Sequence, residues 1–221
     1  MLESELEISK LDAMLDSLGQ LASDLYVLQP HCDREEVKER VGATRVHEIS
    51  IEKTLINFLN RRLKDFVLTG PDKGSADMIK GLAQLTGKPF LILDKKRLAP
   101  NAVTSRGTRK PIPRGLLAKP FVIVDDISST GGTLLATIDR LREYGVGKIT
   151  AFVFHNLIQD AKVWHALQQR EVNLFFSNSL PYEHAAIDII GDVARAVEVS
   201  DDVRVGVRSR QHLRVHHAAQ Q

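Results

Sequence analysis

The chain has little of several features that would indicate a specialised class of protein. Its single cysteine, Cys32, excludes a disulfide within the chain and favours a reducing compartment. No apolar run reaches the roughly 18 residues of a membrane-spanning helix, and the acidic N-terminus lacks the layout of a signal peptide. The formal net charge is only +2, which does not argue for nucleic acid. We therefore expect a soluble cytoplasmic protein without membrane or nucleic-acid partners.

What the sequence does contain is a globular composition and a regular order of short apolar runs and amphipathic segments. Hydrophobic residues make up 43% of the chain, enough for a buried core. Apolar residues at helical spacing predict helices over residues 1–20 and 51–63, whereas residues 32–50 carry no clear period. Farther along, helices are predicted over 75–86, 133–144 and 160–170, and strands over 25–28, 66–68, 89–93, 121–124, 149–154 and 172–176.

The alternation of strands and helices predicts the fold class. Strands separated by helices of about a dozen residues form right-handed βαβ units, so we expect an α/β fold with a mostly parallel sheet flanked by helices. Such sheets bind ligands beyond the carboxyl ends of their strands. The candidate binding loops are therefore those that follow Leu28, Leu68, Leu93, Val124 and Phe154.

The segment after Val124 has the residue types that a phosphorylated sugar requires. Asp125 and Asp126 follow the predicted strand, and Ser129, Thr130, Gly131, Gly132 and Thr133 lead into the predicted helix. A glycine-rich turn at a helix N-terminus supplies convergent N–H donors for phosphate, and the helix dipole favours its negative charge. The two carboxylates suit sugar hydroxyls or a magnesium ion instead. The alternative is an acidic turn before a capped helix, with no ligand.

The whole string from Val124 to Thr133 resembles the PRPP-binding loop of type I phosphoribosyltransferases and of ribose-phosphate diphosphokinases, the PRPP synthetases. The resemblance implies a phosphoribosyltransferase-like fold and binding of ribose 5-phosphate or PRPP. It also implies that Asp125 and Asp126 hold the ribose hydroxyls, that Ser129 lies at the ribose site, and that the segment from Thr130 to Thr133 holds the 5-phosphate.

Three further segments resemble the synthetases in particular. Asp72, Lys73 and Gly74 match the loop that binds the transferred diphosphate, in which the aspartate contacts metal. By the same resemblance Lys95 and Arg97 are catalytic cations at the root of a long polar stretch, where they neutralise charge that develops during transfer. Each segment has a plainer alternative as a solvated turn.

The third segment, Val27 to His31, resembles the synthetase strand that ends in a histidine contacting magnesium and ATP. His31 is therefore a candidate catalytic residue and, with Asp72, a candidate Mg2+ ligand, although a lone histidine is often structural. The resemblance is closest to the archaeal-type synthetases and extends from about Ile8 to Val199.

The resemblance divides the chain into three parts: a remnant of an N-terminal synthetase subdomain at 1–50, a phosphoribosyltransferase-like domain at 51–199, and a basic tail at 200–221. Phe-x-Asp-Gly-Glu and Arg-Gln-Asp, which accompany ATP binding in the synthetases, are not found in the sequence. Two alternatives therefore remain: this chain binds ATP alone, or it binds ATP only together with a partner chain. We also expect a homo-oligomer. The expected activity is PRPP and AMP formation from ATP and ribose 5-phosphate. A PRPP-using phosphoribosyltransferase and a non-catalytic binding or regulatory subunit are the alternatives.

Overall fold

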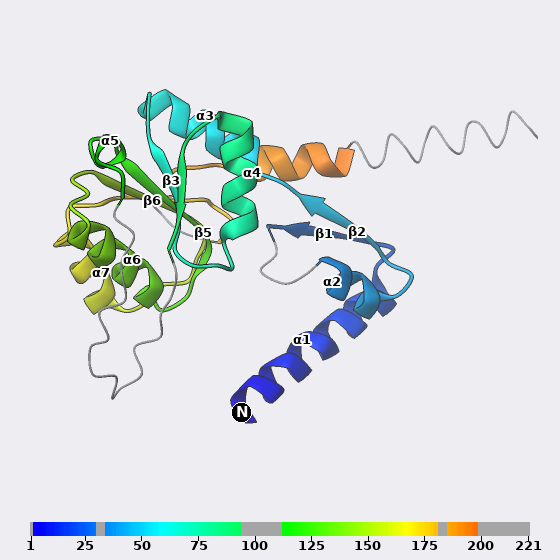
Figure 1. The fold of residues 1–221 in the computed structure, drawn as a ribbon. Helices are drawn as coiled ribbons and strands as arrows, with labels where there is room; N and C mark the ends of the chain where they lie inside the picture. The colour runs from blue at the N-terminus through cyan, green and yellow to red at the C-terminus, as the bar shows by residue number, and fades with distance from the viewer. Residues whose placement is uncertain (1, 30–33, 94–111, 181–184, 199–221) are drawn as a thin grey trace, which may run out of the picture. The chain divides into compact units, whose positions relative to one another are not determined.

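The computed structural model describes residues 2–29, 34–93, 112–180 and 185–198 (Figure 1). These residues belong to two compact units, the first formed by Met1–Ile51 with Ile189–Gln221 and the second by Glu52–Asp188. His31, Lys95 and Arg97 lie outside the described residues, as does the tail at 200–221. No helix within the described ranges is long and apolar enough to cross a membrane.

The described part of the first unit is built from helices and a small parallel sheet. Its elements are α1 (Leu2–Leu21), β1 (Asp24–Leu28), α2 (Arg34–Val41) and β2 (Arg45–Ile49), followed by helical residues at 190–198. β1 pairs with β2 in parallel. The helices approach closely at Gly19, where a Cβ atom would lie 2.6 Å from the carbonyl oxygen of Val41, so only glycine fits.

Residues 32–50, which carry no clear period in the sequence, contain α2 and β2. α2 spans two turns, and its buried side chains among those described are Val37 and Val41, one turn apart, which pack against Leu15 of α1. Two apolar positions are too few to show a helical period. β2 buries Ile49 alone and owes its extended form to pairing with β1, which no local pattern reveals.

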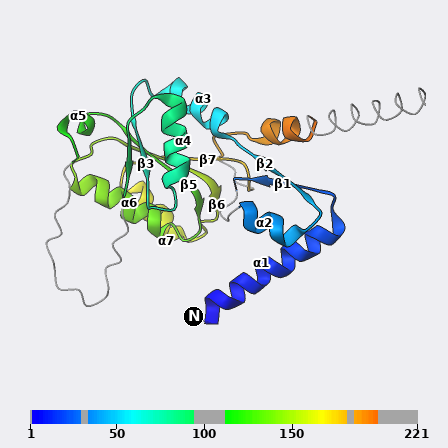
Figure 2. The ribbon, with the colours of Figure 1, turned by 45° about the vertical axis from the view of Figure 1, so that its right-hand side comes forward.

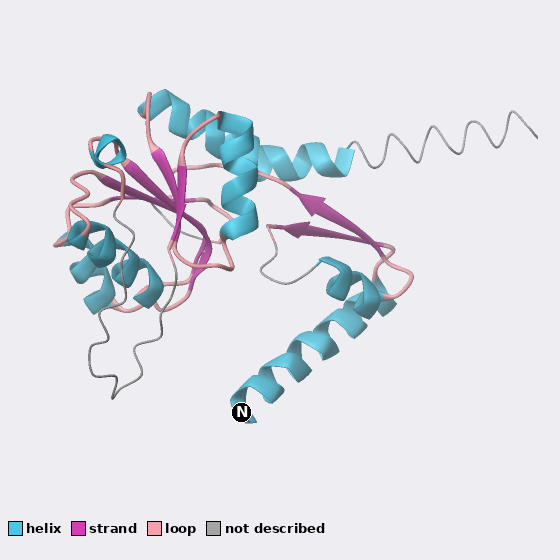
Figure 3. Ribbon diagram, in the orientation of Figure 1, coloured by secondary structure: helices cyan, strands magenta, loops and turns pink. Residues whose placement is uncertain are grey.

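The second unit contains a five-stranded parallel sheet with helices on both faces, which confirms the predicted α/β fold (Figures 1 and 3). The strand order is β4-β3-β5-β6-β7. In chain order the elements are α3 (Glu52–Arg62), β3 (Val67–Gly70), α4 (Ala76–Thr86), β4 (Phe90–Ile92), α5 (Arg114–Leu117), β5 (Phe121–Ser128), α6 (Gly132–Glu143), β6 (Ile149–Asn156), α7 (Ala161–Gln168) and β7 (Asn173–Phe176).

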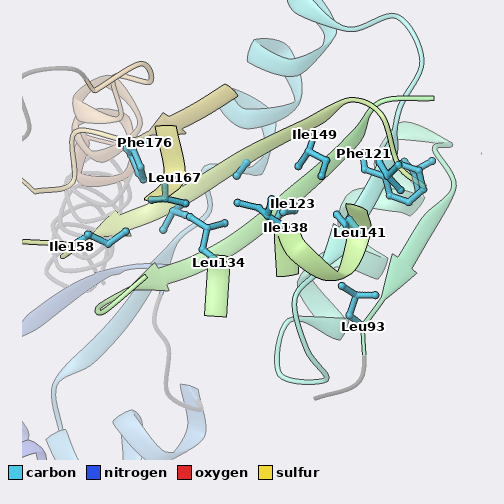
Figure 4. Close-up of a cluster of buried hydrophobic side chains, with 14 of the residues drawn as sticks. Leu93, Phe121, Ile123, Leu134, Ile138, Leu141, Ile149, Ile158, Leu167 and Phe176 are labelled. Carbon is cyan, nitrogen blue, oxygen red and sulfur yellow. The ribbon is translucent and has the colours of Figure 1, made fainter. Parts of the chain in front are cut away.

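Apolar side chains on both faces of this sheet form its core. α4 lies against β3 and β4, and α6 and α7 lie on the opposite face (Figure 2). On the α6 side, Leu134, Ile138 and Leu141 pack with Phe121 and Ile123 of β5 (Figure 4). The intervening residues of β5 are also fully buried, as expected for a parallel strand covered on both faces.

The strand order reverses between β3 and β5. From β3 the chain passes to β4 on one side, whereas from β5 it passes to β6 and then β7 on the other. Open α/β sheets bind ligands at such a switch point, beyond the carboxyl ends of the two strands. The two loops at this point are residues 71–75, after β3, and residues 129–131, after β5.

β5 is longer than we expected, because it continues through both aspartates to Ser128. The predicted end at Val124 was placed where the apolar run stops. β6 accompanies the strand beyond that point, with Asp125 beside Val153 and Ile127 beside His155. Backbone pairing, and not burial, therefore determines where β5 ends.

An ion cluster lies at the amino-terminal ends of the strands, opposite to the carboxyl ends at which the switch point lies. Asp65 precedes β3, Lys88 precedes β4 and Lys119 precedes β5. Lys119 Nζ lies 2.8 Å from Asp65 Oδ2, and Lys88 Nζ donates to the carbonyl of Lys64 at 2.8 Å. The hydrogen bond from Lys119 lowers the pKa of Asp65. These side chains therefore lie at the end of the sheet remote from the switch point.

Candidate functional site

The loop between β5 and α6 is shaped by Gly131. This residue precedes the first residue of α6 with φ of 75° and ψ of −4°, in the left-handed region. A side chain is disfavoured there, because its Cβ would crowd the following carbonyl. The turn allows the chain to pass from the end of β5 directly into the first turn of α6, whose backbone N–H groups form an anion-binding end.

Gly131 is also required by packing. A Cβ atom on it would lie 2.5 Å from Val163 Cγ1 of α7 and 3.2 Å from Ile158 Cδ1. The first distance is far inside van der Waals contact. α7 and the segment before it therefore form a fixed support beneath the loop, which holds its backbone in one place.

Threonine hydroxyl groups contact the backbone of the loop and of the first turn of α6. Thr130 Oγ1 accepts a hydrogen bond from the Gly132 N–H at 3.4 Å, and the Thr133 carbonyl accepts one from Thr137 Oγ1 at 2.7 Å. Ser129, Thr130 and Gly132 are part of an exposed or partly exposed turn. The loop thus offers backbone and hydroxyl donors to solvent at the N-terminus of a helix.

Asp125 and Asp126 lie in the carboxyl-terminal half of β5, the strand next to β3. Both are partly exposed, in contrast to the four fully buried residues that precede them. One carboxylate oxygen of Asp126 accepts the Ile127 N–H at 2.7 Å, which fixes the side chain beside its own backbone. The pair brings two carboxylates to the same sheet edge as the glycine turn.

The loop after β3 is organised by Asp72. Its Oδ1 accepts the N–H of Gly74 at 3.0 Å and that of Ser75 at 3.3 Å, and its carbonyl accepts Ser75 Oγ at 2.7 Å. Ser75 begins α4, so the carboxylate also lies near a helix N-terminus. Asp72 therefore has a local structural role in addition to the metal contact that the resemblance implies.

Gly70, which ends β3, leaves no space for a side chain. A Cβ there would lie 2.4 Å from Ser75 Oγ and 2.8 Å from Ile92 Cδ1 of β4. This close approach brings the strand end, the Asp72 turn and β4 together. Lys73 and Gly74 lie in the same turn, as the sequence predicted for a single binding loop.

The structure thus places the predicted ribose-phosphate residues and the predicted diphosphate loop at the carboxyl ends of two neighbouring strands, β5 and β3. It does not describe the three predicted catalytic residues His31, Lys95 and Arg97. Among the residues that it does describe, no group of three or more histidine, cysteine, aspartate or glutamate side chains could hold a metal ion.

One residue of the same edge was missed. His155 stands near the end of β6, beside Ile127 in the sheet, and its Nδ1 lies 2.9 Å from Ser179 Oγ. The loop after Phe154 was among the candidate loops, but nothing in the local sequence indicated a partner 24 residues away.

Comparison with known proteins identifies the family. The model of the phosphoribosyl transferase domain matches residues 42–185, more than half of the chain, so the chain belongs to this family. Among relatives, it is 26% identical over 181 residues to the ribose-phosphate pyrophosphokinase of Pyrococcus furiosus, with 82% of this chain and 62% of that protein covered. It is 27% identical over 187 residues to that of Pyrococcus abyssi, covering 84% and 62%.

Structural comparison agrees with the sequence matches. Phosphoribosylpyrophosphate synthetase from Mycobacterium smegmatis superimposes with a TM-score of 0.64 at 18% identity, covering 89% of this chain and 64% of that one. At this identity the likeness supports the fold. The chain spans about three fifths of the length of the curated relatives it matches. The resemblance drawn from the sequence motifs is confirmed.

Proposed function

We propose that the chain binds ribose 5-phosphate and PRPP at the switch point between β3 and β5, as part of a ribose-phosphate diphosphokinase. The observation that carries the proposal is the turn at Gly131, which leads from two carboxylates into a helix N-terminus at this point. The named relatives, ribose-phosphate pyrophosphokinases, support the same activity.

In this proposal the 5-phosphate lies at the N-terminus of α6. The backbone N–H groups from Ser129 to Thr133 and the hydroxyls of Thr130 and Thr133 donate to its oxygens. The positive end of the helix dipole favours the phosphate charge. Because the donors are mostly backbone groups held by α7 packing, they are in place before the ligand arrives, which lowers the entropy cost of binding.

The carboxylates of Asp125 and Asp126 accept hydrogen bonds from the ribose hydroxyls. Carboxylates suit this task because they accept several hydrogen bonds. Asp125 and Asp126 precede the loop whose N–H groups bind the phosphate, so their negative charges need not contact it. The sugar is thereby oriented with its 1-hydroxyl toward the loop after β3. Orientation of this kind is a large part of catalysis when the nucleophile is a hydroxyl.

The diphosphate binds the turn of Asp72, Lys73 and Gly74 together with Mg2+. Magnesium usually binds through one or two carboxylates, several waters and the substrate's phosphates, so a single carboxylate here fits the ion. Asp72, whose carboxylate is held in place by the backbone N–H groups of Gly74 and Ser75, is the residue of this turn that would hold the ion. When bound, the ion neutralises charge on the phosphates.

In the reaction, the oxygen of the ribose 1-hydroxyl attacks the β-phosphorus of ATP. The bond between the α–β bridging oxygen and the β-phosphorus breaks, AMP leaves, and the hydroxyl proton is released. Lys95 and Arg97 stabilise the charge that accumulates on the transferred group, and His31 contacts the nucleotide and metal. These three roles are those that the family resemblance implies.

The direct test is to incubate the protein with MgATP and ribose 5-phosphate and to measure AMP and PRPP. Binding is tested separately by the melting temperature, because a ligand that binds only the folded state raises it. Thr130→Glu and Thr133→Glu should abolish the shift with ribose 5-phosphate. Gln84→Glu, an exposed position toward the other end of α4, should leave it unchanged. A wild-type protein that shows no shift at millimolar ligand with Mg2+ would refute the proposal.

The family model itself favours a second candidate, a phosphoribosyltransferase that uses PRPP. The two activities differ in their second substrate. Release of diphosphate from PRPP in the presence of a nucleobase, with no AMP formed from ATP, would favour the transferase. Binding of ribose 5-phosphate without either reaction would leave the non-catalytic subunit as the function.

A further inference from the structure

The carboxyl end of β6 pairs directly with the residues that precede the loop between β5 and α6. This loop, residues 129–131, is called the phosphate loop after its proposed ligand. His155 lies beside Ile127 and Asn156 beside Ser128 in the parallel ladder. The N–H of Leu157 donates to the Ser128 carbonyl at 2.9 Å. The backbone position at which the loop begins is therefore set by β6.

The same end of β6 contacts the loop at its glycine. Asn156 Oδ1 accepts the Ile158 N–H at 3.2 Å, which turns the chain after the strand. Ile158 is buried, and its side chain occupies the space next to Gly131. A displacement of the end of β6 would consequently move both the start of the loop and the support beneath its left-handed residue.

Two serines hold β6 from the other side. Ser177 Oγ donates to the Phe154 carbonyl at 2.6 Å, and Ser179 Oγ donates to the same carbonyl at 2.9 Å. Ser179 also lies 2.9 Å from His155 Nδ1. Three contacts thus attach the segment after β7 to the last residues of β6. Two of them end on the Phe154 carbonyl, and two involve Ser179 Oγ.

Ser179 Oγ contacts two groups at the end of β6. It donates to the Phe154 carbonyl and lies within hydrogen-bond distance of His155 Nδ1. One hydroxyl therefore connects the segment after β7 to both the backbone and a side chain of β6.

We propose that His155 is a positioning residue for the phosphate loop. The hydrogen bond between its Nδ1 and Ser179 Oγ holds the end of β6 in the position that places the Ser129–Thr133 backbone. The residue acts through the sheet and needs no contact with the ligand. The inference rests on the proposed function for the identity of the ligand that the loop holds, but not for the effect of His155 on the loop.

The test compares two substitutions of the same residue. The side-chain amide nitrogen of asparagine approximates the position of Nδ1, whereas that of glutamine approximates Nε2. We expect His155→Gln to accelerate amide hydrogen exchange at Leu157 and Ile158, whose N–H groups are hydrogen-bonded at the end of β6, by about three- to tenfold, the equilibrium change that corresponds to one lost hydrogen bond. The dissociation constant for ribose 5-phosphate should rise by a similar factor. His155→Asn should restore both values close to wild type.

Ser179→Ala supplies an independent variant, because it removes the partner hydroxyl and leaves the imidazole in place. It also loses the bond to the Phe154 carbonyl, so its effects on exchange and binding should be at least as large as those of His155→Gln, and adding His155→Gln to it should change either little. The proposal is overturned if the glutamine and asparagine variants behave alike, or if exchange at Leu157 and Ile158 is unchanged in both His155→Gln and Ser179→Ala. Should wild type not bind ribose 5-phosphate while the exchange pattern appears, the proposed function fails and the role of His155 stands.

Discussion

Substitution of Gly131 by alanine tests two constraints on the loop between β5 and α6. One is the left-handed backbone at this residue, and the other is its close packing against α7. Left-handed backbone costs an ordinary residue about 1–2 kcal/mol. The added Cβ, 2.5 Å from Val163 Cγ1, forces a shift whose cost is typically about 1–3 kcal/mol. We therefore expect Gly131→Ala to lower the free energy of unfolding by about 2–5 kcal/mol, a large part of the stability of an ordinary domain.

Two other glycines of the same unit separate the two contributions. Gly87 ends α4 with φ of 65°, but a Cβ atom added to it would meet nothing within 4 Å, so Gly87→Ala should show only the backbone cost. Gly132 has no positive φ, and the nearest neighbour of an added Cβ, Thr130 Oγ1, would be at 3.5 Å. Gly132→Ala should therefore leave stability unchanged or slightly raise it, since alanine favours helix.

The assay is urea denaturation followed by the fluorescence of Trp164, the only tryptophan of the chain. Trp164 lies in α7, donates to the Ile158 carbonyl at 3.3 Å and packs edge-on against Phe176, so it reports on the support beneath the loop. Adding Val163→Ala to Gly131→Ala should recover part of the loss. A loss for Gly131→Ala no greater than that for Gly87→Ala would refute the packing argument.

Three further predictions concern charged residues. Lys95→Ala or Arg97→Ala should reduce PRPP formation by about two to four orders of magnitude, as for lost transition-state donors, with much less change in ribose 5-phosphate affinity measured by calorimetry. Asp72→Asn should keep the turn, because its amide oxygen still accepts the two N–H groups, but weaken Mg2+-dependent diphosphate binding, whereas Asp72→Ala should lose both. The hydrogen bond from Arg170 lowers the pKa of Asp139 below its ordinary 3.8. Its stabilising effect is therefore complete above that value and lost as the pH falls through the lowered pKa, so acid unfolding curves of Asp139→Asn should lack this component.

Most of the second unit could be predicted from the sequence because its elements carry strong local signals. The buried run from Phe121 to Val124 and the amphipathic pattern after it correctly predicted a strand and a helix. The helix predicted over 75–86 is α4, which Gly87 ends in the left-handed conformation. Where apolar patterning and turn chemistry agree, the sequence alone is sufficient.

The remaining features depend on contacts between distant residues. β2 forms because β1 lies beside it, and β5 runs past its apolar residues because β6 continues to pair with it. The dual role of Gly131 could be foreseen only in part. Its turn conformation follows from the residue type, but its contact with Val163 requires the packing of α7. The link between His155 and Ser179 was missed for the same reason.

The ion cluster of Asp65, Lys88 and Lys119 has a practical consequence for work on this protein. All five strands run in the same direction, so the cluster and the glycine turn lie at opposite ends of the sheet. The amino-terminal end of the sheet is therefore the place to introduce a single attachment point for a fluorophore or a sensor surface. Proteins immobilised there would present the edge with Asp72 and Gly131 to the solution, which suits surface-based measurements of ribose phosphate binding.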